Sequence, residues 1–197
     1  MTNPLGKLLI LGAIIIVAFV LWKGFLYAPN DEVDSGIVGG NQVSQNVPTE
    51  HLPSRLIIPK LEIDTDIQHL GVTSTGNMAA PSNFTDVSWY KHGTVPGYEG
   101  SAVMAGHVDN ALGTPAVFYE LPKLETGDDI YVVRENGERL HYKVVSMDLY
   151  PWDNSPVEKI FNDDSGKYLN LITCQGEWVA EARSAENRLV IYTKLVE

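Results

Sequence analysis

The sequence predicts a mainly β fold, a barrel or sandwich of about eight strands with short helices on its connections. Short apolar or alternating segments recur through residues 54–197 and are separated by turns rich in Gly, Pro, Asn and Asp. Asn136-Gly137 lies between two such segments, and this pair is a strong signal for a β-hairpin. Helical patterns do not alternate regularly with the strands, so a sheet built from βαβ units is not expected.

Each expected strand has its own pattern. Residues 63–67 alternate Ile or Thr with Asp, as in a half-exposed strand, whereas residues 101–105 are mostly apolar, as in a buried central strand. Gly176 is expected to end the strand that carries Cys174. The expected strands, in chain order, are 55–59, 63–67, 101–105, 129–134, 139–147, 169–174 and 188–195. We expect them to form an antiparallel or mixed sheet.

Two short helices are predicted on the connections. Thr114 has the character of an N-cap with proline following it, and that helix is expected to end near Leu121, before a second proline. The run from Ser155 to Glu158 matches a capping box with proline at the first helical position, which predicts a helix through about Phe161.

Length and composition limit the possible functions. A chain of 197 residues, less a terminal anchor, is expected to form one domain with a sizeable core. The net charge of −11 argues against a nucleic-acid-binding protein, which would present a basic surface. No Cys-x-x-Cys or His-x-x-x-His spacing occurs, so we expect neither a metal site nor a cofactor.

The N-terminal residues differ in kind from the rest. Residues 8–22 are apolar except for one glycine, and Lys23 can snorkel at a membrane interface, which extends the stretch to about 20 residues. Lys7 precedes the stretch, so we expect residues 1–28 to be a cytoplasmic tail and single-pass membrane anchor with the domain outside the cell. A cleaved signal peptide is the alternative. Residues 29–53 are polar and acidic, which predicts a flexible extracellular spacer before a domain at 54–197.

Cys174 is the only cysteine of the chain. Alternation along its strand places it at the strand end, on the same face as Asn170 and Ile172. Free cysteine is often a buried small hydrophobe, which is one interpretation of Cys174. An exported protein usually pairs its cysteines, however, so a single one indicates an intermolecular bond or a reactive thiol.

A reactive thiol needs a base and a group that stabilises developing negative charge. His107 directly follows a buried strand and a glycine, a position at which a side chain is held firmly. His92 in the long loop is a lesser candidate. Arg188 opens the last strand and would lie beside the sulfur if the two strands are neighbours, and Arg183 is the fallback.

Three segments resemble the motifs of the sortase family. Leu171-Ile172-Thr173-Cys174 is similar to the Thr-Leu-x-Thr-Cys signature, with Asn170 in place of the first Thr. Ala105-Gly106-His107 resembles the histidine segment, and Asn187-Arg188-Leu189-Val190 resembles the arginine strand. The resemblance covers about residues 54–197 and is greatest to class F or class F-like sortases of Gram-positive bacteria.

The resemblance implies a sortase-type closed β-barrel and a membrane-anchored cysteine transpeptidase. Such an enzyme cleaves a Leu-Pro-x-Thr-Gly-type sorting signal of exported proteins and transfers the product to an amine, such as that of a peptidoglycan precursor or a protein lysine. It implies that Cys174 is the nucleophile, His107 the acid and base, and Arg188 the group that stabilises the oxyanion or aligns the substrate. Thr173 is expected to add a hydrogen bond beside the thiol, at the substrate.

Two alternatives of other classes stay open from the residues alone. An L,D-transpeptidase also uses a thiol on the cell wall, but its Ser-x-Gly-Cys-x-Arg pattern does not fit the Gln175-Gly176 that follows Cys174. A non-catalytic surface module tethered to the membrane would carry Cys174 as an inert core residue. Labelling of the native thiol separates this module from an enzyme.

Overall fold

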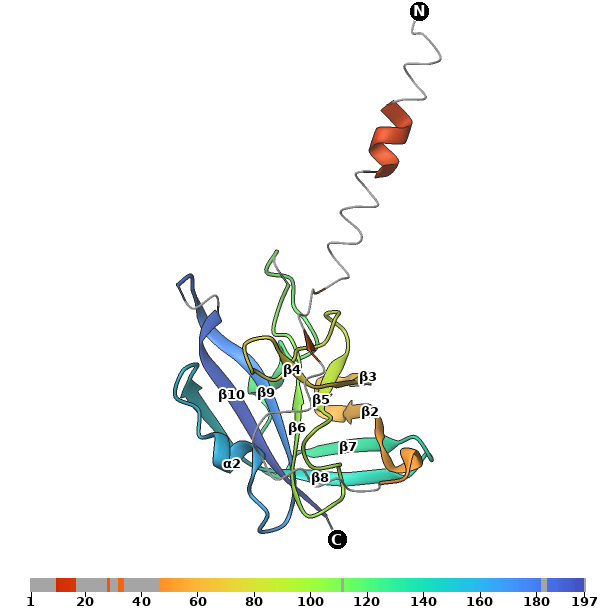
Figure 1. Ribbon diagram of the computed structural model, residues 1–197, viewed down its shortest axis with the longest axis vertical. Helices are drawn as coiled ribbons and strands as arrows, with labels where there is room; N and C mark the ends of the chain where they lie inside the picture. Colours follow the sequence, from red (N-terminus) through yellow and green to blue (C-terminus); the bar gives the residue numbers. More distant parts are fainter. Residues whose placement is uncertain are drawn as a thin grey trace, which may run out of the picture.

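A computed structural model describes residues 10–16, 28, 32–33, 47–110, 112–181 and 184–196. Eight strands close into a barrel in the order β10-β8-β7-β2-β3-β5-β6-β9 (Figure 1). The barrel strands are β2 (Pro53–Ile58), β3 (Ile63–Leu70), β5 (Val87–Tyr90), β6 (Gly100–Ala105), β7 (Asp129–Arg134), β8 (Arg139–Pro151), β9 (Lys167–Val179) and β10 (Ser184–Leu195). The predicted closed barrel of about eight strands is therefore confirmed.

The sheet is mixed, as the sequence indicates. β7 and β8 form the expected hairpin through Asn136-Gly137, where Gly137 has a φ of 82°. β3 pairs with β5 and β6 pairs with β9 in parallel, while the other barrel pairs are antiparallel. The parallel pair β6–β9 matters most for function, because it places the end of β6 beside the centre of β9.

The alternation of side chains along the strands separates an inner core from an outer cluster. Inward residues such as Leu169 and Leu171 of β9 are fully buried in the main core. On the outer face of β6, β9 and β10, Ile160 of the short helix α2 (Val157–Phe161) packs on Val103 and Val190. The outer cluster therefore attaches α2 to the outside of the barrel (Figure 1). Cys174 belongs to this outer face of β9, because it alternates with the inward Thr173 and follows Ile172 of the outer cluster by two residues.

Gly176 does not end β9, contrary to the prediction. The strand continues to Val179, and its pairing with β10 passes through a bulge between Ala185 and Asn187. Gly176 has a φ of 94°, which glycine adopts at no steric cost, so the residue supports the bulge and does not stop the strand. The glycine in the sequence therefore marks an irregularity of this strand, and the irregularity is a bulge and not a strand end.

The helix predicted from Thr114 to Leu121 is wrong. Pro115 forms a bridge with Asp109, and the Phe118 N–H donates to the His107 carbonyl at 2.9 Å. This segment therefore folds back along the residues that follow β6, and the only helix in this region is the short η3 (Leu121–Lys123) among the described residues. Backbone pairing with residues 107–109 replaces the helical hydrogen bonds that the proline pattern predicts.

The second predicted helix exists as α2, but its capping box does not form. Pro156 is the N-cap and no side chain caps the helix. The Ser155 hydroxyl donates instead to the Pro151 carbonyl at 3.3 Å. Asn170, which replaces the first Thr of the sortase signature, holds α2 from below because its buried amide donates to the Ile160 carbonyl at 2.7 Å.

The predicted anchor at residues 1–28 lies mostly outside the described residues. Within the part that the structure describes, no helix is long and apolar enough to cross a membrane. Ala28, the last residue of the predicted anchor, donates its N–H to the Ser82 carbonyl at 2.9 Å. Within the predicted spacer, β1 (Glu32–Val33) pairs with β4 (Val72–Thr73) of the domain.

Candidate active site

The register of β6, β9 and β10 brings the backbones of Cys174, Arg188 and the segment with His107 close together. Arg188 of β10 is the Cα partner of Cys174 on β9, and residues opposite one another in an antiparallel pair project from the same face. On the other side of β9, Ala105 of β6 is in register with Ile172, and continuing this register by two residues places His107 beside Cys174. The Gly106 N–H donates to the Ile172 carbonyl at 3.2 Å, so the pairing extends past the end of β6.

Cys174 is a free and half-buried cysteine. It lies on the outer face of the barrel, whereas its neighbour Thr173 is buried on the inner face. Its strand is paired with β10 at Cys174 itself and with β6 as far as Ile172, so the backbone that carries the thiol is held within the barrel. A half-exposed thiol on a rigid strand differs from the inert core cysteine that the alternative interpretation requires.

His107 is held by a backbone carbonyl. Its Nε2 lies 3.0 Å from the Pro81 carbonyl oxygen, which can only accept, so Nε2 carries a proton and Nδ1 is the basic nitrogen of the neutral ring. Phe84 packs on the ring with centroids 5.2 Å apart. Burial lowers the pKa of His107, and the hydrogen bond to Pro81 and the charge of Asp109 only partly offset this effect. The imidazole is therefore neutral at neutral pH and can accept a proton at Nδ1.

Arg188 is oriented by the end of its own strand. Its Nη2 donates to the Ser184 hydroxyl at 2.6 Å, and Nη1 donates to the carbonyls of Ala185 and Asn187 at 3.3 and 3.2 Å. None of the carboxylates in the described part of the chain forms an ion pair with this guanidinium. Among the described residues, Arg188 thus carries a positive charge without an ion-pair partner on the strand position opposite Cys174, and such a charge is suited to a developing oxyanion or a substrate carbonyl.

The family model of the sortase domain matches residues 56–196. The chain belongs to the sortase family. This match includes all eight barrel strands except the first residues of β2, and it includes Cys174, His107 and Arg188. The search of the curated proteins gave no match.

Solved sortase structures share the fold at low sequence identity. A sortase A lid mutant from Corynebacterium diphtheriae is 20% identical with a TM-score of 0.58, covering 78% of this chain and 74% of that one. Sortase C1 from Streptococcus suis is 20% identical with a TM-score of 0.57, covering 75% and 74%. A Clostridium perfringens sortase D5 transpeptidase is 17% identical with a TM-score of 0.53, covering 74% and 79%. These neighbours are named as sortases of types A, C and D, and the resemblance to class F stays a prediction.

Thr173 of this sortase is buried on the inner face of the barrel. Its buried hydroxyl donates to the Gly106 carbonyl at 2.9 Å. This bond links β9 to the residue that precedes His107. The expectation that Thr173 contacts substrate stays a prediction, and the bond that the structure shows gives its hydroxyl a role in joining β9 to the segment with His107.

Gly106→Ala is expected to damage both the fold and the site of this sortase. A Cβ at this position would lie 2.6 Å from Cδ2 of Phe118, a fully buried ring that must then shift. Overpacking of this kind typically costs about 1–3 kcal/mol. We expect a lower melting temperature in calorimetry and a reduced rate of peptide cleavage. Gly137→Ala is the control for backbone strain without a clash, because its φ of 82° disfavours alanine in the β7–β8 turn while no atom lies within 4 Å of the new Cβ; it is expected to lower the melting temperature without lowering the rate of cleavage. Equal activity of Gly106→Ala and wild type would contradict the close packing beneath His107.

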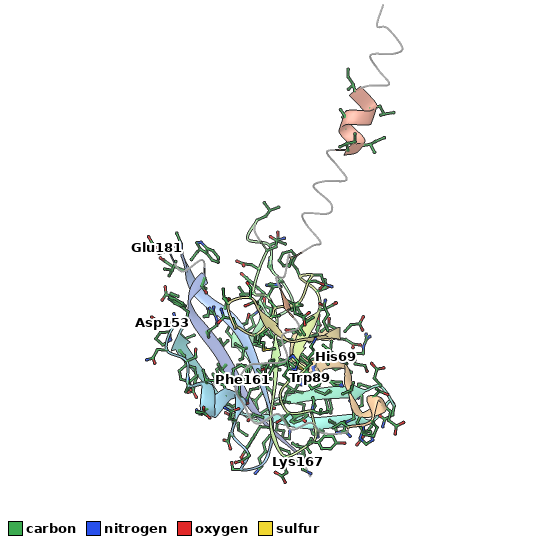
Figure 2. The ribbon with its side chains drawn as sticks, viewed as in Figure 1. His69, Trp89, Asp153, Phe161, Lys167 and Glu181 are labelled. Atoms are coloured by element: carbon green, nitrogen blue, oxygen red, sulfur yellow. The ribbon has the colours of Figure 1, made fainter. Side chains whose placement is uncertain are left out.

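The other histidines of the domain are engaged elsewhere. His69 bonds to the Pro53 carbonyl at 2.6 Å and packs edge to face on Trp89, with ring centroids 5.2 Å apart (Figure 2). His141 lies 2.7 Å from an Asp129 oxygen. His92 packs against Tyr90, with ring centroids 5.9 Å apart. The structure therefore favours His107 over His92, and Arg183, the fallback for Arg188, lies outside the described residues.

Sequence reasoning missed the groups that orient His107. Pro81 contributes only a backbone carbonyl, and Gln68 and Ser82 are polar residues of ordinary type in a strand and a loop. No spacing in the sequence connects them with residue 107. The antiparallel pairing of β5 with β6 brings the loop before β5 to the end of β6, and the parallel pairing of β3 with β5 brings Gln68 to the same loop.

Proposed function

We propose that this sortase is a membrane-anchored cysteine transpeptidase that cleaves a Leu-Pro-x-Thr-Gly-type sorting signal in exported proteins. The observation that carries the proposal is the register of β9, which pairs Cys174 with Arg188 of β10 on one side and brings the segment after β6, with His107, to the other side. Family membership supports the same class of reaction. The half-exposed thiol supports an enzyme over a non-catalytic module, and no observation favours an L,D-transpeptidase.

In the first half of the reaction, Cys174 becomes acylated. The Cys174 thiol gives its proton to Nδ1 of His107, and the thiolate attacks the carbonyl carbon of the substrate Thr. The positive charge of Arg188 stabilises the oxyanion that forms. The Thr–Gly bond then breaks, His107 returns the proton to the leaving amine, and the acyl group remains on sulfur as a thioester.

In the second half, an amine resolves the thioester. His107 takes a proton from the incoming amine, whose nitrogen attacks the thioester carbonyl. The carbon–sulfur bond breaks, a new amide forms, and Cys174 regains its proton. The expected acceptors are a peptidoglycan precursor and a protein lysine, and water gives hydrolysis in their absence.

Arg188→Ala is expected to lower kcat/KM for a sorting-signal peptide by about 10²–10³, the usual cost of removing one donor to an oxyanion. Arg188→Lys keeps the charge but loses the planar fork, so we expect partial activity. Lys194→Ala, which removes an exposed cation from the same strand, is the matched control and is expected to be fully active. Steady-state kinetics on the full-length chain measure all three. An unaffected Arg188→Ala would remove Arg188 from the mechanism.

The test of the proposed function is cleavage with transfer. The full-length protein is incubated with a fluorogenic Leu-Pro-x-Thr-Gly peptide and an amine acceptor, either triglycine or a lysine-containing peptide. We expect cleavage between Thr and Gly and a product in which the acceptor is joined to Thr, identified by mass spectrometry. A peptide with the Thr and Gly exchanged serves as the control. Absence of cleavage with every sorting-signal variant tested would contradict the proposal.

We propose further that residues 1–28 anchor the protein in the cell membrane, with the N-terminus cytoplasmic and the catalytic domain extracellular. The apolar run at residues 8–22, with Lys7 before it, supports this arrangement. Expression of the full chain and of residues 29–197 in a Gram-positive host, followed by fractionation and protease treatment of intact cells, tests it. Release of the full chain into the medium would contradict an uncleaved anchor.

A further inference from the structure

We propose that Gln68 is a positioning residue that orients His107 through the peptide plane between Pro81 and Ser82. The proposal rests on the proposed function for its kinetic consequences, but its structural consequences are measurable without activity. Gln68 lies in β3, and the hydrogen bonds of its side chain go to Asp86 and Ser82.

One peptide unit joins the two side chains. The carbonyl of Pro81 accepts from Nε2 of His107 at 3.0 Å. The N–H of the same peptide unit, which belongs to Ser82, donates to Oε1 of Gln68 at 3.0 Å. A peptide unit is planar, and its C=O and N–H point in opposite directions when it is trans. The direction in which the carbonyl points at His107 is therefore set by where Gln68 holds the N–H.

The Gln68 amide is itself held in one orientation. Its Nε2 donates to a carboxylate oxygen of Asp86 at 2.9 Å, and the same oxygen accepts from the amide of Asn83 at 2.7 Å. A carboxylate oxygen only accepts, so the amide nitrogen of Gln68 faces Asp86 and its oxygen faces Ser82. The Ser82 hydroxyl adds a second bond to that oxygen at 3.1 Å. The chain of bonds thus runs from Asp86 through Gln68 and one peptide plane to His107.

The carbonyl matters because it fixes which nitrogen of His107 is basic. A firmly placed acceptor at Nε2 keeps the proton there and leaves Nδ1 free for proton transfer. It also restricts rotation of the ring, and a misplacement of about 1 Å in a catalytic group can lower a rate by about 100-fold. Serial hydrogen bonds through an amide polarise one another, so loss of the Gln68 bond also weakens the bond at His107.

The experiment compares Gln68→Ala with a rescue variant and a matched control in the full-length chain. Gln68→Ala removes the acceptor for Ser82. In the double variant Gln68→Glu with Asp86→Asn, the carboxylate at position 68 still accepts from the Ser82 N–H. The amide at position 86 now donates to position 68, so the bond between these two side chains is kept with donor and acceptor exchanged. Thr65→Val is the control, because Thr65 lies on the same strand and bonds to the same loop, through the Thr85 carbonyl at 2.6 Å, but outside the chain of bonds to His107.

Two readouts are required. In NMR spectra of protein with 15N-labelled histidine, we expect Gln68→Ala to populate the Nδ1–H tautomer of His107 and to lower its pKa, because the bond to Pro81 favours the charged ring. In steady-state kinetics, we expect kcat to fall about 10- to 100-fold with KM little changed. The double variant is expected to restore both readouts, and Thr65→Val is expected to alter neither, although it lowers thermal stability.

The two readouts distinguish failure of this proposal from failure of the proposed function. An unchanged tautomer and pKa of His107 in a folded Gln68→Ala protein would overturn the positioning role, whatever the activity. If Gln68→Ala changes the tautomer of His107 but the wild-type protein cleaves no sorting signal, the positioning role is upheld and the proposed function is contradicted. If Gln68→Ala does not fold, the double variant decides. Wild-type NMR and kinetic values in that variant support the role, and a disturbed tautomer in that variant overturns it.

Discussion

Cys174→Ala is expected to abolish cleavage of a sorting-signal peptide and leave the barrel folded. The reaction requires sulfur, because the acyl group is carried on it between the two half-reactions, and no other cysteine exists to replace it. The substitution removes only one half-exposed atom, and the backbone bonds of β9 to β6 and β10 are unaffected. Cleavage is measured with the fluorogenic peptide, and the fold by circular dichroism and thermal unfolding.

The native thiol offers an independent control for this result. Because Cys174 is the only cysteine, any thiol label reports on this residue alone. A half-exposed nucleophile should react with a maleimide in the native protein, and prior labelling should inactivate the enzyme. Labelling that requires denaturant, together with full activity of Cys174→Ala, would favour the non-catalytic surface module.

His107→Ala is expected to lower kcat/KM by about 10²–10⁴, the usual contribution of a general acid and base. The ring is the only imidazole that the β6–β9 register places beside the thiol, among the histidines of the described chain. His141→Ala is the matched control, since it removes an imidazole from a strand position that pairs with Asp129. Loss of activity in His92→Ala with retention in His107→Ala would assign the base to the other residue.

The lowered pKa of His107 predicts that the free energy of unfolding depends on pH. Burial lowers the pKa of His107 in the folded protein below its ordinary value of 6.5, so the unfolded chain binds more protons between the two values. The free energy of unfolding is therefore highest above about pH 6.5 and falls as the pH decreases toward the folded pKa. We expect urea unfolding of His107→Gln to lack this component of the slope between pH 7.5 and 5. An identical slope in both proteins would contradict a buried neutral imidazole.

Periodicity predicts seven of the eight barrel strands but misses β5, and it does not distinguish a barrel from a sandwich; the closed barrel is implied by the family resemblance. The hairpin at Asn136-Gly137 and the alternating strand that carries Cys174 are determined by residues close together in sequence, so local patterns predict both. The candidate residues came from position at strand ends. Family resemblance then indicated their roles, and the strand order of the barrel places them together.

The errors arose where tertiary pairing overrides local signals. Thr114-Pro115 has the local signature of a helix start, but pairing with residues 107–109 satisfies this backbone first. Gly176 has the local signature of a stop, yet β10 continues alongside and converts it into a bulge. The orientation of His107 depends on Pro81, which is distant in sequence and contributes only a carbonyl, so no residue pattern could indicate it.

The most direct test of the central claim is intact-mass spectrometry of the full-length protein mixed with a Leu-Pro-x-Thr-Gly peptide and quenched in acid. The account predicts a mass increase equal to the peptide up to its Thr, mapped to Cys174 by proteolysis and removed by hydroxylamine or an amine acceptor. The increase should be absent in Cys174→Ala. An unmodified protein during active cleavage, or an adduct on any residue other than Cys174, would contradict the account.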